Sequence, residues 1–217
     1  MASRRRGVER RRWQRLPLSI PVFVRGVDER GKDFLELTTA FNVSAGGALL
    51  AMRRYLPRSS RVTLEIPSAP LPCLATPPDF VRMLRARLVR VTHSERYHLW
   101  GLKNERVYVD GRRRTAERRH WQRLPLAIPV FVRGVDGRGK KFLEFTTAFN
   151  VSAGGALLVT GRYLPRSSRI TLEIPSAPLL RVAPPLHSVR TLRAQPIRVT
   201  HSDGGYLVNL KFTRPLV

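Results

Sequence analysis

The chain has 217 residues and carries 40 lysines and arginines against 15 aspartates and glutamates, a formal net charge of +25. Residues 1–108 hold 21 basic and 9 acidic side chains and residues 109–217 hold 19 and 6, so both halves are basic and a polyanionic partner is favoured. The single cysteine, Cys73, excludes a disulfide within the chain and a metal site built on thiolates.

The apolar segments of the sequence are short. No run approaches the roughly 20 apolar residues that a transmembrane helix needs. The basic residues 4–12 and the apolar residues 16–24 resemble the start of a signal peptide, but the same apolar run recurs in mid-chain at residues 124–132. We therefore interpret this run as a strand and expect a cytoplasmic protein without a membrane span.

The second half of the chain repeats the first. Residues 13–26 recur as residues 121–134 with 13 of 14 positions identical, at an offset of 108 residues. This period is too long for a solenoid, and about 100 residues suffice to bury a separate core. We predict two tandem domains: residues 1–107, with an N-terminal basic arm, and residues 108–217, which begin with a linker and second arm at residues 108–123.

Strand patterns fill the first copy. Residues 18–24 alternate apolar and polar side chains with a period of two, which is typical of a half-buried strand. Pro21 withholds a ladder N–H, so we expect an edge position or a bulge there. A hairpin at residues 26–32 leads to a return strand at residues 34–41. The other expected strands of this copy are residues 48–52, 61–66, 81–92 and 97–103.

The second copy repeats this series and ends with expected strands at residues 189–200 and 206–212. Strands of this length and spacing, with few helical stretches, predict an antiparallel all-β barrel or sandwich in each half.

No enzyme motif stands out. The spacing from Gly26 through Gly31 and Lys32 matches a phosphate-binding P-loop, but Asp33 occupies the position of the magnesium-binding Ser or Thr, and a strand pattern follows in place of a helix. The five histidines show no metal-binding spacing, and neither HExxH nor CxxC occurs. We therefore expect no catalytic residues, no metal and no cofactor.

Two short patterns occur once in each copy. The first is an Arg-x-x-x-Arg before the first strand, which we call the arm (residues 11–15 and 119–123). The second is an Asn-x-Ser-x-x-Gly between two strands, which we call the corner (residues 42–47 and 150–155). Taken alone, the arm can be explained as a solvated basic segment and the corner as a turn. Their recurrence together, at matching distance, favours a shared function.

Arm and corner together resemble the PilZ domain family of cyclic di-GMP receptors, and the resemblance covers both halves. It implies a six-stranded antiparallel β-barrel in each copy, and hence an all-β chain of two tandem barrels. It also implies a non-catalytic role in bacterial second-messenger signalling, with cyclic di-GMP as ligand. The ligand-binding residues that it implies are Arg11, Arg12, Arg15, Asn42, Ser44, Gly47, Arg119, Arg123, Asn150, Ser152 and Gly155.

The chemistry of these side chains suits such a ligand. Arginine donates bidentate hydrogen bonds to phosphates and to the O6/N7 edge of guanine, worth roughly 1–3 kcal/mol of discrimination in duplex readout. Asparagine offers one carbonyl acceptor to a guanine N–H, and serine offers a hydroxyl. Glycine permits a positive φ or a close approach of the backbone.

Two other functions remain open from the sequence. The net charge of +25 also suits a basic nucleic-acid-binding protein, whose affinity would fall steeply with salt. A degenerate barrel that serves as an interaction module for an unidentified protein partner is the third possibility, although both copies keep their motifs.

Overall fold

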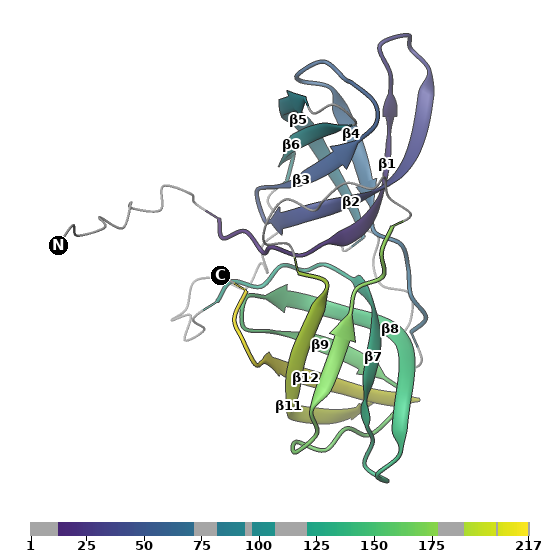
Figure 1. Ribbon diagram of the computed structural model, residues 1–217, viewed down its shortest axis with the longest axis vertical. Coiled ribbons are helices and arrows are strands. Elements are labelled where there is room, and N and C mark those ends of the chain that lie inside the picture. The colour runs from purple at the N-terminus through teal and green to yellow at the C-terminus, as the bar shows by residue number, and fades with distance from the viewer. Residues whose placement is uncertain are drawn as a thin grey trace, which may run out of the picture.

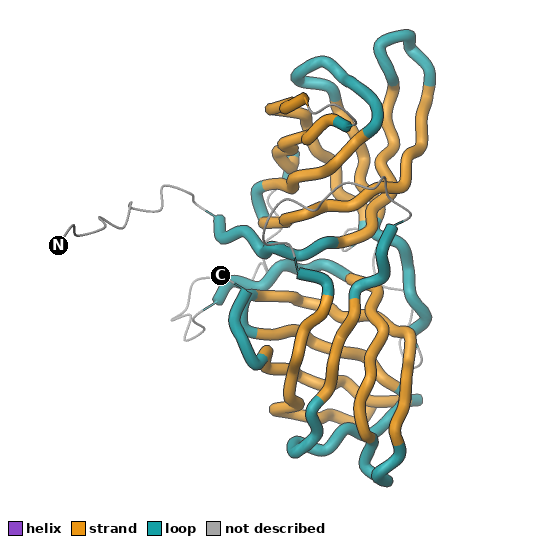
Figure 2. The backbone as a smooth tube through the Cα atoms, in the orientation of Figure 1, coloured by secondary structure: helices purple, strands orange, loops and turns teal. Residues whose placement is uncertain are grey.

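The computed structural model describes residues 13–71, 82–93, 97–106, 121–177, 189–202 and 204–216. Within these ranges the chain is all β, and its strands close into two six-stranded antiparallel barrels (Figures 1 and 2). This confirms the fold class expected from the sequence. In the part of the chain that the structure describes, no helix is long and apolar enough to cross a membrane.

The first barrel has the strand order β1-β2-β3-β6-β5-β4. Its strands are β1 (Ile20–Val27), β2 (Asp33–Ser44), β3 (Gly47–Met52), β4 (Arg61–Glu65), β5 (Met83–His93) and β6 (His98–Asn104). Antiparallel pairing of β1 with β4 closes the ring.

The second barrel repeats this order at the equivalent strands, β7-β8-β9-β12-β11-β10. Its strands are β7 (Ile128–Val135), β8 (Lys141–Ser152), β9 (Gly155–Thr160), β10 (Ile170–Glu173), β11 (Thr191–Ser202) and β12 (Gly205–Phe212). The predicted division between the domains, at residues 107 and 108, lies outside the described residues.

Alternation along the strands builds the core of each barrel. Ile20, Val22 and Val24 point inward and are at most 3% exposed, while Trp100 of β6 is fully buried. Burying one such side chain contributes roughly 1.5–3 kcal/mol. Because the alternation has a period of two, it fixes the register of every strand against the core.

The strands extend further into the corners than the sequence indicated. Residues 42–47 were expected to interrupt the strand pattern, but β2 continues to Ser44 and β3 begins at Gly47, so that only Ala45 and Gly46 form the turn. The reason is pairing across the tight turn, since Val43 has a ladder partner in Ala48. The expectation of an interruption over the whole motif was wrong.

Pro21 lies outside the β1–β4 ladder, so its missing N–H costs the sheet no hydrogen bond to β4. It pairs with Thr39 of β2, whereas β1 contacts β4 only from Phe23 to Gly26. The prediction of a locally unpaired edge at Pro21 is therefore confirmed on the β4 side of the strand.

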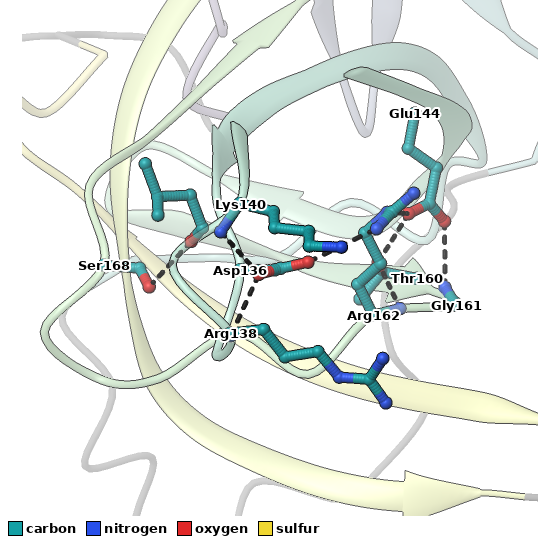
Figure 3. Close-up of polar contacts among 9 residues, drawn as sticks. Asp136, Arg138, Lys140, Glu144, Thr160, Gly161, Arg162 and Ser168 are labelled. Carbon is teal, nitrogen blue, oxygen red and sulfur yellow. Dashed lines mark hydrogen bonds and ion pairs between the residues drawn. The ribbon is translucent and has the colours of Figure 1, made fainter. Parts of the chain in front are cut away.

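A polar network holds the β7–β8 hairpin, as Figure 3 shows. The Asp136 carboxylate accepts hydrogen bonds from the backbone N–H groups of Arg138 (2.9 Å) and Lys140 (3.0 Å). It also forms an ion pair with Arg162 at 3.3 Å. Arg162 follows β9, so the network ties the hairpin to the next strand pair.

The first barrel repeats this turn. Asp28 accepts hydrogen bonds from the N–H groups of Arg30 (2.9 Å) and Lys32 (3.0 Å), and Gly31 has a left-handed φ of 74°. The segment that shares the spacing of a P-loop is thus a hairpin turn, as the sequence predicted.

The Asp136 network predicts a dependence of stability on pH. The Lys140 N–H, with smaller contributions from Arg138 and Arg162, holds the pKa of Asp136 below its ordinary value of 3.8. The carboxylate therefore stabilises the fold fully above that value, and the stabilisation is lost as the pH falls through the lower folded pKa. We expect Asp136→Asn to lower Tm at pH 7, and the gap to wild type to close as the pH falls below 3.8.

Thermal unfolding followed by circular dichroism between pH 7 and pH 2.5 would measure this gap. Asp33→Asn removes the same charge from an exposed strand end and serves as the control. A gap that stays constant over this pH range would contradict the assigned role of the Asp136 charge.

Candidate functional site

Each arm leads directly into its own corner. Leu16, which follows the first arm, exchanges two backbone hydrogen bonds with Val43 of the corner: its N–H donates to the Val43 carbonyl at 2.8 Å and its carbonyl accepts at 3.1 Å. In the second barrel the N–H of Leu124 donates to the carbonyl of Val151 at 2.8 Å. These bridges place Arg15 and Arg123 beside the corners, on the same side of each barrel.

The tryptophan within each arm packs on a corner glycine. A Cβ built on Gly46 would lie 2.7 Å from Cδ1 of Trp13, and one on Gly154 would lie 2.7 Å from Cδ1 of Trp121. Both rings also pack against the barrel core. Because these glycines have no side chain, the indole ring packs directly on their backbone, and this contact fixes the position of the arm.

The predicted arginines are only partly described. Arg15 is exposed and Arg123 is half-buried, whereas Arg11, Arg12 and Arg119 lie outside the described residues. The structure thus brings one arginine of each arm next to its corner.

The serines of the corners bond within their own turns. Ser44 Oγ donates to the Gly47 carbonyl at 3.2 Å, and Ser152 Oγ donates to the Gly155 carbonyl at 3.1 Å. Each hydroxyl keeps lone pairs that can accept a further hydrogen bond, and Ser152 is buried whereas Ser44 is half-buried.

The two asparagines differ between the copies. Asn42 pairs with Leu49 in the β2–β3 ladder, and its Oδ1 is buried without a hydrogen-bond partner among the described residues. Asn150 has a left-handed φ of 49°, and the ladder is interrupted between Phe149 and Ser152. Asparagine tolerates this conformation better than most residues. An unsatisfied buried acceptor costs about 1–3 kcal/mol.

The last glycine of each corner is required by a close approach between strands. A Cβ on Gly47 would lie 2.0 Å from the Leu102 carbonyl oxygen of β6, and one on Gly155 would lie 2.0 Å from that of Leu210 in β12. Of the two reasons that the sequence left open for these glycines, close backbone approach is the one that both corners share.

Sequence reasoning missed how the corner carbonyls are satisfied. In the first barrel the buried side chain of Asn104 donates Nδ2–H to the Ala45 carbonyl at 3.1 Å. In the second barrel the equivalent carbonyl, that of Ala153, accepts from the backbone N–H of Leu216 at 2.9 Å. The only signal in the sequence is that Phe212 stands where Asn104 does in the first copy.

The residues that follow the first arm also contact the second barrel. The N–H of Val189 donates to the Pro17 carbonyl at 2.6 Å, and the N–H of Ser19 donates to the Val189 carbonyl at 3.0 Å. These bonds flank a parallel bridge between Leu18 and Val189. Residues 17–19, which lie between the first arm and β1, are therefore bonded to the second barrel.

The arms and corners lie away from three cavities of the described structure. These cavities have volumes of about 750, 720 and 560 Å³. None of them is lined by an arm arginine or a corner residue. Among the described residues, no group of three or more side chains is arranged to hold a metal ion.

Residues 9–114 match the model of the PilZ domain family. Among curated proteins, none matches the sequence.

Solved structures with a similar arrangement include three proteins. The Bacillus subtilis inhibitor of motility MotI/DgrA has 15% identity, with 91% of this chain and 89% of that chain covered and a TM-score of 0.31. The K. pneumonia MrkH–c-di-GMP complex has 13% identity, coverages of 90% and 80% and a TM-score of 0.30. Escherichia coli YcgR in complex with c-di-GMP has 11% identity, coverages of 89% and 75% and a TM-score of 0.29.

The family match and the internal repeat agree. The matched segment contains the whole first barrel, and the second half of the chain repeats its sequence and its strand order. On this evidence residues 9–114 form a PilZ domain, and the second half of the chain is a repeat of it.

Proposed function

We propose that the protein is a cytoplasmic receptor for cyclic di-GMP in a bacterium, which acts by binding and not by catalysis, with one binding surface on each barrel. The observation that carries the proposal is the backbone bridge between arm and corner, Leu16 with Val43 and Leu124 with Val151. The bridges support the proposal because they bring the backbone of each arm next to its own corner.

The roles of the side chains follow from their chemistry. Arg15 and Arg123 would donate to phosphate or to the guanine O6/N7 edge, together with Arg11, Arg12 and Arg119 of the arms. Asn42 and Asn150 would accept a guanine N–H. Ser44 and Ser152 would complete the polar rim, and Gly47 and Gly155 would keep β3 and β9 close to β6 and β12.

Calorimetry with cyclic di-GMP tests the proposal. We expect wild type to bind at both barrels and Arg15→Ala to weaken the first site alone by about 10- to 100-fold, since a bidentate guanine contact contributes roughly 1–3 kcal/mol. Arg123→Ala should weaken the second site by a similar factor.

Arg30→Ala, which removes an exposed arginine from the tip of the β1–β2 hairpin, is the matched control and should leave both sites unchanged. Wild type that takes up no cyclic di-GMP, or arginine variants that bind as wild type does, would rule out the proposed receptor function.

A further inference from the structure

A second basic surface lies on the outer side of the first barrel, across β4, β5 and β6. It consists of Arg61, Arg85, Arg87 and Lys103, all exposed, and we call it the basic face. The side chains between them along the strands, such as Val62, Ala86 and Leu102, point into the core and are at most 4% exposed. The alternation of each strand therefore directs these cations outward together.

The strand register places like charges directly opposite one another. Arg87 is the Cα partner of Arg61 on one side and of Lys103 on the other, so three cations form a row across three neighbouring strands. Adjacent strands lie about 4.8 Å apart. Like charges opposite each other destabilise a sheet, and a bound anion would remove that repulsion.

One carboxylate pairs with an end of the row and, among the residues that the structure describes, leaves the centre of the row unpaired. Glu105 forms an ion pair with Arg61 at 3.3 Å, and Glu65 forms one with Arg25 at 3.2 Å. Within the described residues, the side chains of Arg85 and Arg87 make no ion pair or hydrogen bond.

The second barrel carries the same face with one interruption. Arg169, Arg193 and Lys211 occupy the equivalent positions, but Gln195 replaces Arg87 and donates Nε2–H to the Arg166 carbonyl at 2.9 Å. The second barrel therefore carries the row with a neutral side chain at its centre, which supplies the substitution for a test.

We propose that the basic face binds the phosphate backbone of duplex DNA without reading its bases. A row of exposed guanidinium and ammonium groups across three neighbouring strands suits regularly spaced phosphates. Single-strand binding needs aromatic side chains on which bases stack. The exposed aromatic side chains of the described residues, Tyr55, Phe145 and Tyr163, lie outside β4, β5 and β6.

Fluorescence anisotropy with a labelled 24-base-pair duplex of arbitrary sequence, between 50 and 300 mM NaCl, tests this proposal. Arg85→Gln/Arg87→Gln should weaken binding at least about 10-fold at low salt and reduce the slope of log K against log salt by about 2. Gln195→Arg, which completes the row in the second barrel, should strengthen binding and raise the slope by about 1.

The control variant Arg30→Gln/Arg53→Gln removes the same charge from exposed positions away from the face and should change the affinity by less than about 3-fold. An equal loss in this control would overturn the proposal, because it would show that only net charge matters. Displacement of the duplex by poly-glutamate at an equal charge concentration would also overturn it, in favour of an acidic protein partner.

Calorimetry tests whether this surface is separate from the cyclic di-GMP site. Arg85→Gln/Arg87→Gln should bind cyclic di-GMP as wild type does, and Lys103 is left unchanged because its Cα partner is Gly47 of the corner. A parallel loss of cyclic di-GMP and DNA binding would assign the basic face to the nucleotide site and overturn its separate role.

Discussion

Replacing Gly47 with alanine is expected to unfold the first barrel at temperatures where wild type is stable. The new Cβ would lie 2.0 Å from the Leu102 carbonyl oxygen and 3.0 Å from its carbonyl carbon, and both atoms belong to the backbone of β6. A side chain could rotate away, but this backbone is paired with β3 from Gly47 to Met52. The clash is therefore relieved only by separating two strands of a closed barrel.

The cost should be large on the scale of domain stability. Overpacking a rigid site costs about 1–3 kcal/mol or more, and a domain of this size is stable by roughly 5–15 kcal/mol. We expect a loss of at least about 3 kcal/mol and a fall in Tm of more than about 12 °C for the affected barrel. Urea unfolding followed by circular dichroism would measure the loss.

The second copy and a turn glycine supply the controls. Gly155→Ala meets the Leu210 carbonyl oxygen at the same 2.0 Å and should destabilise the second barrel by a similar amount. Gly31→Ala meets nothing within 4 Å, and only its left-handed φ of 74° opposes the change, at about 1–2 kcal/mol. A Gly47→Ala protein as stable as Gly31→Ala would mean that β3 and β6 lie further apart than described.

The strands were predictable because their pattern is local. Alternation over residues 18–24 is visible in the sequence, and burial of Ile20, Val22 and Val24 follows from it directly. The corner misled the same reasoning, since Asn42 and Ser44 are turn-forming residues. Their place within β2 depends on partners in β3 and on Leu16, which no local pattern reveals.

The candidate site was predictable only in part, and for a similar reason. The motifs and the family resemblance named Arg15, Asn42, Ser44 and Gly47, and the structure places these residues around one corner. Asn104 was not foreseen as the donor to the Ala45 carbonyl, because that contact spans 59 residues of sequence. No sequence pattern foretold the bonds between Pro17 and Val189, because they depend on how the two barrels pack.

Gly46→Ala, one residue before Gly47, is expected to affect ligand binding and not the fold. It should leave the barrel folded and weaken cyclic di-GMP binding at the first site by about 10-fold, a prediction that rests on the proposed function. The new Cβ would meet Cδ1 of Trp13 at 2.7 Å and Nε1 at 3.4 Å. These atoms belong to a side chain of the arm, so the arm can move away while every strand of the barrel keeps its partners.

Two readouts separate the position of the arm from ligand binding. Displacement of the half-buried Trp13 indole into water should shift the tryptophan emission to longer wavelength without any ligand, while urea unfolding should show a loss of about 1–2 kcal/mol, smaller than that of Gly47→Ala. Gly154→Ala is the matched change beneath Trp121, with the same 2.7 Å contact, and should act on the second site.

A double-mutant cycle with Trp13→Ala then tests the cause. If Gly46 acts only by packing against the indole ring, Gly46→Ala and Trp13→Ala remove the same interaction. The double variant should then bind cyclic di-GMP no more weakly than Trp13→Ala alone. Additive losses would show that Gly46 contacts the ligand directly. A shifted emission spectrum with unchanged affinity would show that cyclic di-GMP does not depend on where the arm lies, and the arm would then lose its part in the proposed site.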